Sequence, residues 1–315
     1  MTALLEITNL SKHYPARDGH GLVRAVNEVS LSVEAGRTVG IVGESGCGKS
    51  TLARLMLRLI APTAGAIDFA GENFLALSSA ALRRRRRDLQ IVFQDPYASL
   101  DPRMNVSDII SEPLDIHSIG NKHERRAKVL ELLALVGLDR SAASKYPHEF
   151  SGGQRQRIGI ARAIALEPKL VVLDEPVSAL DVSIQSQILN LLIDLKRRLN
   201  LSYVFISHDL SVVKHVSDEV AVMYLGRIVE YGKAEQVLDS PLHPYTQALI
   251  SAVPEIDPEK KKQRIVLAGD PPNPEDIPSG CAFHRRCQYS MDICKELLPQ
   301  LHRAGDQTVA CHLYP

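Results

Sequence analysis

The sequence lacks a net charge, a long apolar run and a leader-like N-terminus. Lys+Arg and Asp+Glu number 37 each, so no overall field draws the chain to nucleic acid or to an anionic membrane surface. No stretch reaches the roughly 18–20 apolar residues that a membrane-spanning helix requires. The first residues lack the charged n-region and apolar core of a secretory signal. We therefore expect a cytoplasmic protein for which any role at a membrane comes through a partner subunit.

A glycine-rich stretch between an apolar run and a helix-forming segment carries the clearest chemical signal. Gly43-x4-Gly48-Lys49-Ser50 fits the phosphate-binding loop pattern without a mismatch. Glycines let backbone N–H groups converge on an anion, Lys49 can reach the β- and γ-phosphates, and the Ser50 hydroxyl can ligate Mg²⁺. The sequence therefore predicts a nucleoside triphosphate site rather than a chance glycine-rich turn. Its candidate ATP-binding residues are Gly43, Glu44, Ser45, Gly46, Cys47, Gly48, Lys49, Ser50 and Thr51.

Short stretches of alternating apolar and polar residues flank this loop. Residues 2–37 alternate in pieces split by Pro15, which predicts antiparallel strands. Tyr14, beside a turn, is either a packing residue or a stacking platform for a base, and the residues alone favour packing. Five arginines, Arg83 to Arg87, end a predicted helix. Given the zero net charge, they favour a solvated helix face beside a partner surface over nucleic-acid binding.

Polar residues follow three of the predicted strands. Gln94 lies where a side chain could face the γ-phosphate. Four apolar residues at 170–173, typical of a strand buried on both faces, lead into Asp174 and Glu175. Asp174 suits Mg²⁺ held through water and Glu175 suits an attacking water, the alternative being a solvated strand end. His208 shares this edge, which favours phosphate sensing over the more usual structural role.

A capping-box pattern begins another predicted helix. Ser151 and Gln154 have the capping-box spacing, so the structural explanation is a well-capped helix start. The functional explanation uses the same geometry, because Gly152 and Gly153 allow close approach and the helix dipole points at an anion.

Pattern and composition divide the chain into parts. Residues 101–146 are helical in pattern without a strand signal, which predicts a helical subdomain of about residues 98–160 inserted in an α/β core. Beyond residue 235 prolines cluster, and a charged stretch at 259–262 indicates a linker. We expect a nucleotide-binding domain at 1–235 and a C-terminal extension at 236–315.

Together these stretches resemble the ATP-binding subunit of ABC transporters. In family order they look like the Walker A loop at 43–51, Gln94 of the Q-loop, the signature at 151–155, Walker B at 170–175, Asp181 of the D-loop and the switch histidine His208. Phe150 stands where leucine is common, a mild departure. Residues 146–151, 241–249 and 280–287 also resemble the second (F-type) ATPase subunit of dipeptide/oligopeptide importers.

The resemblance implies a fold and a reaction. The fold is α/β, a P-loop NTPase (RecA-like) core with an N-terminal antiparallel β subdomain, an inserted helical subdomain and a small C-terminal metal- or cluster-binding appendage. The reaction is ATP hydrolysis that energises import of dipeptides or oligopeptides. Glu175, His208 and Gln94 would be catalytic, and Tyr14 would stack on adenine. Mg²⁺ would be held via Ser50, Gln94 and Asp174.

It also implies partners. Two ATP-binding subunits, paralogues or two copies, would pair head to tail with each ATP between one Walker A loop and the other subunit's signature. Residues 95–104 would report to two transmembrane permease subunits at the cytoplasmic face of the membrane, and a peptide-binding protein would act indirectly. Glutathione or metal chelates remain alternative cargoes. A soluble ABC ATPase acting on DNA or ribosomes is disfavoured, because the sequence shows no long coiled-coil insertion, fused second half or basic face.

Four of the five cysteines crowd the C-terminal extension. Disulfides are disfavoured in a cytoplasmic protein, and four thiolates suit zinc or a [4Fe–4S] cluster. The spacing lacks the tight pairs of zinc ribbons, and the family resemblance favours the cluster over zinc and over metal-free thiols. The ligands would be Cys281, Cys287, Cys294 and Cys311, with His284, His302 and His312 as spare candidates. The fifth, Cys47, is a spacer in the loop whose modification would block ATP.

Overall fold

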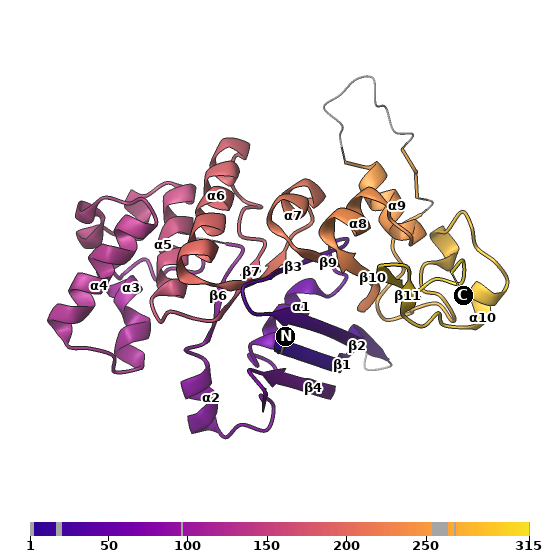
Figure 1. Ribbon diagram of the computed structural model, residues 1–315, viewed down its shortest axis with the longest axis horizontal. Coiled ribbons are helices and arrows are strands. Elements are labelled where there is room, and N and C mark those ends of the chain that lie inside the picture. Colours follow the sequence, from indigo (N-terminus) through magenta and orange to yellow (C-terminus); the bar gives the residue numbers. More distant parts are fainter. Residues whose placement is uncertain (1–2, 17–20, 96, 254–263, 268, 315) are drawn as a thin grey trace. The chain divides into compact units, whose positions relative to one another are not determined.

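The structure is a computed structural model that describes residues 3–16, 21–95, 97–253, 264–267 and 269–314. The predicted linker at 259–262 lies outside the described residues. The chain forms two compact units (Figure 1). The first comprises Met1–Ser32, Thr38–Leu75 and Ser207–Pro315, and the second Val33–Arg37 and Ala76–Ile206.

A mixed sheet forms the centre of the first unit. Its strands run in the order β11 (His302–Ala304), β12 (Gln307–Val309), β10 (Arg227–Lys233), β9 (Glu219–Tyr224) and β3 (Thr38–Val42). β3 pairs with β9 in parallel, and the other pairs are antiparallel. Every residue of β3 is buried, as expected for a parallel strand covered on both faces.

A second sheet in this unit confirms the antiparallel strands predicted near the N-terminus. It has the order β2 (Leu22–Glu34), β1 (Ala3–Pro15), β4 (Ala64–Phe69) and β5 (Glu72–Asn73). β1 pairs antiparallel with β4, and their inward-facing aliphatic side chains are buried.

Short helices complete the first unit. α7 packs on β3, and α8 packs on β10. Asp209 caps the start of α7, since its carboxylate accepts the backbone N–H groups of Ser211 and Val212. The helices are α1 (Lys49–Met56), α7 (Leu210–Val216), α8 (Ala234–Asp239), α9 (Pro244–Ser251), the 3₁₀ helix η3 (His284–Arg286) and α10 (Ile293–Glu296).

The second unit contains three parallel strands, β8 (Ser202–Ile206), β7 (Leu170–Asp174) and β6 (Leu89–Val92), in that order. β7 is buried along its whole length, which confirms the prediction for residues 170–173. Its helices are α2 (Ser79–Arg85), α3 (Val106–Ile116), α4 (Lys122–Leu135), η1 (Arg140–Ser144), η2 (Pro147–Glu149), α5 (Gly152–Ile164) and α6 (Val182–Leu199). Among the described residues of both units, no helix is long and apolar enough to cross a bilayer.

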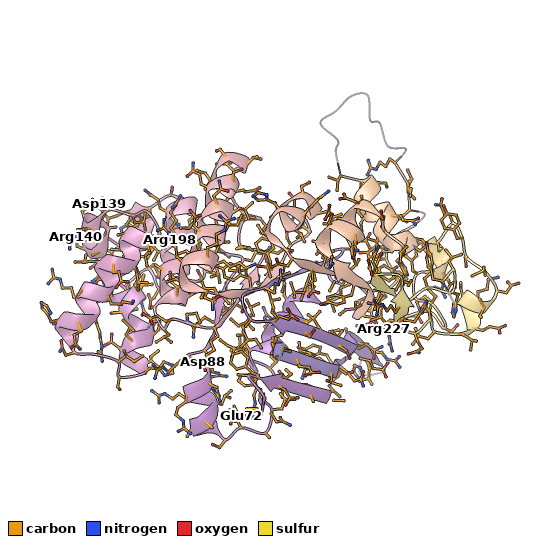
Figure 2. All side chains as sticks on the ribbon, in the orientation of Figure 1. Glu72, Asp88, Asp139, Arg140, Arg198 and Arg227 are labelled. Atoms are coloured by element: carbon orange, nitrogen blue, oxygen red, sulfur yellow. The ribbon has the colours of Figure 1, made fainter. Side chains whose placement is uncertain are left out.

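The five-arginine stretch lies at the end of α2 and just beyond it. Two of its guanidinium groups make contacts within this unit. Arg83 donates to the carbonyl of Ile116 at 2.6 Å. Arg85 donates to Asp88, which is labelled in Figure 2, at 3.3 Å. These two arginines therefore join elements of their own unit, while the proposed partner surface stays a prediction.

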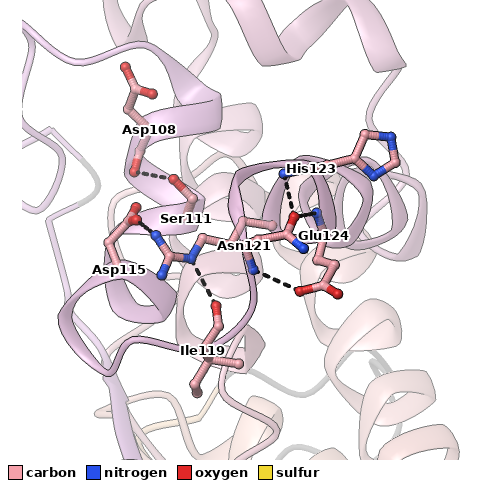
Figure 3. Close-up of polar contacts among 8 residues, drawn as sticks. Asp108, Ser111, Asp115, Ile119, Asn121, His123 and Glu124 are labelled. Carbon is pink, nitrogen blue, oxygen red and sulfur yellow. Dashed lines mark hydrogen bonds and ion pairs between the residues drawn. The ribbon is translucent and has the colours of Figure 1, made fainter.

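Helices dominate residues 98–160. Within this range the described residues form α3, α4, α5 and two 3₁₀ turns and no strand. α3 contacts both α4 and α5. A capping box begins α4: Asn121 accepts the N–H of Glu124, whose carboxylate accepts the N–H of Asn121 at 2.7 Å (Figure 3). Arg125 then ties this turn to the end of α3 through Asp115 and the carbonyl of Ile119.

Candidate nucleotide-binding site

The glycine-rich loop joins β3 to α1 in the first unit. Gly48 has φ of 106°, and a Cβ there would lie 2.0 Å from the carbonyl oxygen of Ala25. A Cβ on Gly43 would lie 2.2 Å from the carbonyl oxygen of Met223. Neighbouring backbone thus crosses the loop at both glycines and leaves no room for a side chain. The phosphate-loop pattern has a steric reason in this fold.

The start of α1 is arranged for an anion. Gly48 is its N-cap, and among the described residues no side chain caps the helix and no acidic residue lies in its first turn. The backbone N–H groups of its first turn and the positive dipole end therefore point at the loop. The Lys49 side chain is 5% exposed, and its ammonium donates to the carbonyls of Gly43 at 2.8 Å and Glu44 at 3.0 Å. Lys49 thus lies over the loop.

Cys47 is buried inside this loop, with 4% of its surface exposed. Burial raises the pKa of its thiol, and the nearby Lys49 ammonium only partly offsets this effect. The thiol therefore stays protonated and shielded, which disfavours reaction with alkylating reagents. The predicted block of ATP by modification of Cys47 stays a prediction.

Two other candidate residues belong to the first unit. Tyr14 is 37% exposed, so it is no core residue, and the Lys12 ammonium lies 5.0 Å from its ring centroid. His208 is exposed. The N–H of its neighbour Ser207 donates to the carbonyl of Ile41 near the end of β3 at 3.2 Å. Since the loop begins where β3 ends, His208 lies at the same edge as the loop.

The acidic pair lies in the second unit, at the end of β7. Asp174 is buried to 7% exposure, while Glu175 turns the chain with a positive φ of 49°. Such a conformation is uncommon for a residue with a side chain and costs about 1–3 kcal/mol. The Glu175 N–H donates to Ile206 at 3.0 Å, and its carboxylate accepts from the Gln94 amide at 2.8 Å. The structure thus brings Gln94 and Glu175 together.

The turn after this pair leads into α6. The Ser178 hydroxyl donates to the carbonyl of Glu175 at 3.1 Å. Asp181 is the exposed N-cap of α6 and does not cap it through its side chain. These contacts hold the turn, while the Asp181 carboxylate faces outward.

The predicted capping box at the start of α5 is confirmed. Ser151 accepts the N–H of Gln154 at 3.4 Å and donates its own N–H to the Gln154 side chain at 3.0 Å. Arg155 donates to the Pro147 carbonyl at 2.7 Å, and its guanidinium lies 3.8 Å from the ring centroid of Tyr97. Sequence analysis missed this cation–π contact, which ties α5 to the segment after Gln94. The glycine-rich loop belongs to the other compact unit.

The four C-terminal cysteines are gathered but not in a metal-binding arrangement. Among the described residues, no group of three or more His, Cys, Asp or Glu side chains is placed to hold a metal ion, so the predicted metal- or cluster-binding appendage is not shown. Burial raises the pKa of Cys281 to about 11, and the other three thiols add to this rise. The N–H of Cys281 donates to the carbonyl of Cys294 at 2.8 Å. Four thiols are suitable ligands for a cluster, but in the described residues they are not placed so as to hold one.

The spare histidines are all engaged with backbone. Ring nitrogens of His284, His302 and His312 contact the carbonyls of Cys281, Gln300 and Leu297, respectively, at 2.8–3.1 Å.

A cavity of about 340 Å³ lies beside the cysteines in the first unit. Its wall includes Cys281, Phe283 and the ion pair of Arg227 with Glu28, whose atoms are 2.8 Å apart; Arg227 is labelled in Figure 2. Of the four C-terminal cysteines, Cys281 is the one that lines this cavity.

Two residues of the C-terminal extension contact the loop itself and were missed by the sequence analysis. Arg286 forms a bidentate ion pair with Glu44, and the Tyr245 hydroxyl accepts the N–H of Glu44. They follow Glu44 by 242 and 201 positions, respectively. No local pattern marks them, so only the folded chain reveals the contact.

These features define a class of protein. A phosphate loop between a buried strand and an uncapped helix, and a second buried strand ending in paired carboxylates, characterise P-loop ATPases. Two family models match the chain: ABC transporter at residues 26–178, and oligopeptide/dipeptide transporter, C-terminal region, at 229–294.

The relatives narrow this class. The oligopeptide transport ATP-binding protein AppF of Bacillus subtilis is 53% identical, over 99% of this chain and 97% of its own length. The dipeptide transport ATP-binding protein DppF of Escherichia coli is 51% identical, over 98% and 93%. The solved cassette MJ0796, a dimer bound to ADP and Pi, is 30% identical with a TM-score of 0.67, over 73% of this chain and 98% of that one. The chain belongs to the ATP-binding subunits of the dipeptide/oligopeptide ABC importers, and it is an ABC-type ATPase.

Proposed function

We propose that this chain hydrolyses ATP to energise the import of dipeptides or oligopeptides through a membrane ABC transporter. The match of its C-terminal region to the oligopeptide/dipeptide transporter model carries the peptide assignment. Full-length identity above 50% to AppF and DppF supports it. Glutathione or a metal chelate is the alternative cargo, since the binding protein and the membrane subunits would select the solute.

Each predicted site residue has a distinct role in this proposal. The uncapped start of α1 and Lys49 bind the phosphates, and Tyr14 stacks on the adenine. Ser50, Gln94 and Asp174 would hold Mg²⁺, which when bound would supply positive charge beside the phosphates. Glu175 accepts the proton of the attacking water, with its carboxylate oriented by the Gln94 amide 2.8 Å away.

The remaining predicted residues act between subunits in this proposal. The dimeric MJ0796 cassette supports a second ATP-binding subunit as partner. The capped start of α5, with Ser151 and the following glycines, would contact the ATP of that partner, and Asp181 would lie near the dimer interface. His208 would sense the γ-phosphate. Two permease subunits would hold the pair at the cytoplasmic face of the membrane and couple it indirectly to a peptide-binding protein.

We further propose that the four C-terminal cysteines bind a [4Fe–4S] cluster, with zinc as the alternative. The support is the donor set: four thiols, three of them with pKa values raised by burial and by neighbouring thiols. Ligation would relieve this cost, because bound thiols lose their protons to the metal. Anaerobic purification followed by iron, sulfide and zinc assays tests it. Equimolar zinc would select the alternative, and absence of all three elements would contradict both.

Transport itself is tested in proteoliposomes that contain this subunit, its partner ATPase and two permease subunits. We expect ATP-dependent uptake of a labelled dipeptide delivered by the binding protein. A subunit with Lys49→Ala should abolish uptake, because the loop loses its ammonium. Uptake of labelled glutathione but of no peptide would reject the peptide assignment.

A further inference from the structure

Glu44 lies inside the phosphate loop, and the C-terminal extension holds it at two points. The Glu44 carboxylate accepts two hydrogen bonds from the Arg286 guanidinium, Nη1 to Oε2 at 2.8 Å and Nη2 to Oε1 at 3.0 Å. The backbone N–H of Glu44 donates to the Tyr245 hydroxyl at 2.9 Å. All three residues belong to the first compact unit.

Both contacts rest on a buried residue of the extension. The Arg286 side chain is 7% exposed while that of Glu44 is 27% exposed, and Tyr245 is fully buried. The Tyr245 ring packs against Tyr224 and Phe283, with centroids 4.6 and 5.5 Å away, which fixes the position of its hydroxyl. Bidentate arginine–carboxylate pairs are stronger and more directional than single contacts.

The charges give these contacts a role. A triphosphate is strongly anionic, and Lys49 supplies the loop's ammonium, over the carbonyls of Gly43 and Glu44. The Glu44 carboxylate is a negative charge in that same loop. Without a cation beside it, this carboxylate would repel the triphosphate at short range. Arg286 supplies that cation, and Tyr245 orients the peptide between Gly43 and Glu44.

We propose that Arg286 and Tyr245 are positioning residues of the phosphate loop, through which the C-terminal extension sets ATP affinity. Arg286 neutralises Glu44 so that the loop accepts a triphosphate. Tyr245 holds the Glu44 N–H, and with it the Gly43 carbonyl of the same peptide, which Lys49 contacts. This inference rests on the proposed ATP site at residues 43–51.

The test is ATP binding by titration calorimetry on the full-length chain, with thermal unfolding to verify folding. Arg286→Gln should weaken ATP binding at least about tenfold, because it leaves the Glu44 carboxylate unpaired. Adding Glu44→Gln to that variant should restore binding to within about threefold of the wild type, since it removes the repelling charge. Arg285→Gln, the exposed neighbour, is the matched control and should bind as the wild type does.

A packing role alone predicts no rescue, so a double variant as weak as Arg286→Gln would overturn the inference. Should Arg286→Gln fail to fold, Arg286→Lys keeps the charge and should bind ATP with intermediate affinity; loss of binding equal to that of Lys49→Ala would count against charge neutralisation. Tyr245→Phe removes only the hydroxyl and should raise the KM for ATP with little change in kcat. Lys49→Ala separates the two proposals. If Lys49→Ala bound ATP as the wild type does, the proposed ATP site would be rejected. If Lys49→Ala lost ATP binding while Arg286→Gln bound ATP normally, only the positioning role would be rejected.

Discussion

Replacing Glu175 with glutamine tests the catalytic assignment with little change of shape. The carboxylate accepts the Gln94 amide at 2.8 Å, and the carbonyl oxygen of a glutamine at 175 can accept the same bond. The turn is fixed by backbone contacts, including the N–H of residue 175 to Ile206, which the substitution leaves in place. The substitution removes the negative charge and with it the ability to take a proton from water.

General-base catalysis contributes about 10²–10⁴-fold, so Glu175→Gln should lower kcat by that factor. This loss corresponds to about 2.7–5.4 kcal/mol of transition-state stabilisation at 1.36 kcal/mol per tenfold. Phosphate release at saturating ATP measures it. Calorimetry should show ATP affinity within about threefold of the wild type, because the substitution leaves the Lys49 ammonium and the glycine-rich loop unchanged.

A matched control is Glu131→Gln, an acid on α4 with 57% of its side chain exposed. It should leave turnover unchanged. If Glu175→Gln also kept near-normal turnover, Glu175 would not be the base. If ATP binding fell together with kcat, the effect would come from a disturbed fold.

Three further predictions concern stability and the helix starts. Asn121→Ala removes the capping box of α4 and should cost about 1 kcal/mol in urea denaturation; no loss would show that the contact is not used in solution. Ser151→Ala should cost a similar amount and also lower kcat while the chain still binds ATP at its own loop; unchanged turnover would contradict its role toward a partner. His243 is fully buried, its Nδ1 accepts the N–H of Tyr245, and burial lowers its pKa from 6.5 to about 3. Its contribution to stability is therefore present above pH 6.5 and lost as pH falls toward 3, by up to about 1.4 kcal/mol per pH unit. The difference in unfolding free energy between the wild type and His243→Asn, which keeps a capping acceptor, should shrink over this range, and a pH-independent difference would refute the reasoning.

Sequence patterns predicted the features that depend on residues only a few positions apart in the chain. The buried strand before Asp174 and the capping box at Ser151 depend on neighbours within a few residues, so periodicity and spacing are sufficient to find them. The sequence predicted that Gly43 and Gly48 are required, but it could not give the steric reason. The pattern marked both glycines, but the backbone that crosses them comes from Ala25 and Met223.

Contacts that are distant in the sequence could not be predicted in this way. Arg286 and Glu44 have no shared pattern, and the pairing of Tyr97 with Arg155 joins a loop to a helix more than fifty positions later. The metal-binding arrangement expected of the cysteines depended on number and spacing, which report neither distance nor orientation of the thiols. Tertiary packing decides all three.

The pairing of β12 with β10 has a consequence for truncation. Glu230 lies opposite Val309, Tyr231 lies opposite Thr308, and the N–H of Ala310 donates to the carbonyl of Val229 at 2.9 Å. This hairpin occupies one side of β10, whose residues are mostly buried. A chain shortened to remove the cysteines would leave that row of N–H and C=O groups unpaired, and unpaired strand edges are templates for aggregation. The C-terminal extension thus covers this side of β10 and so disfavours self-association through it. Its cysteines are therefore better removed by point substitution than by deletion.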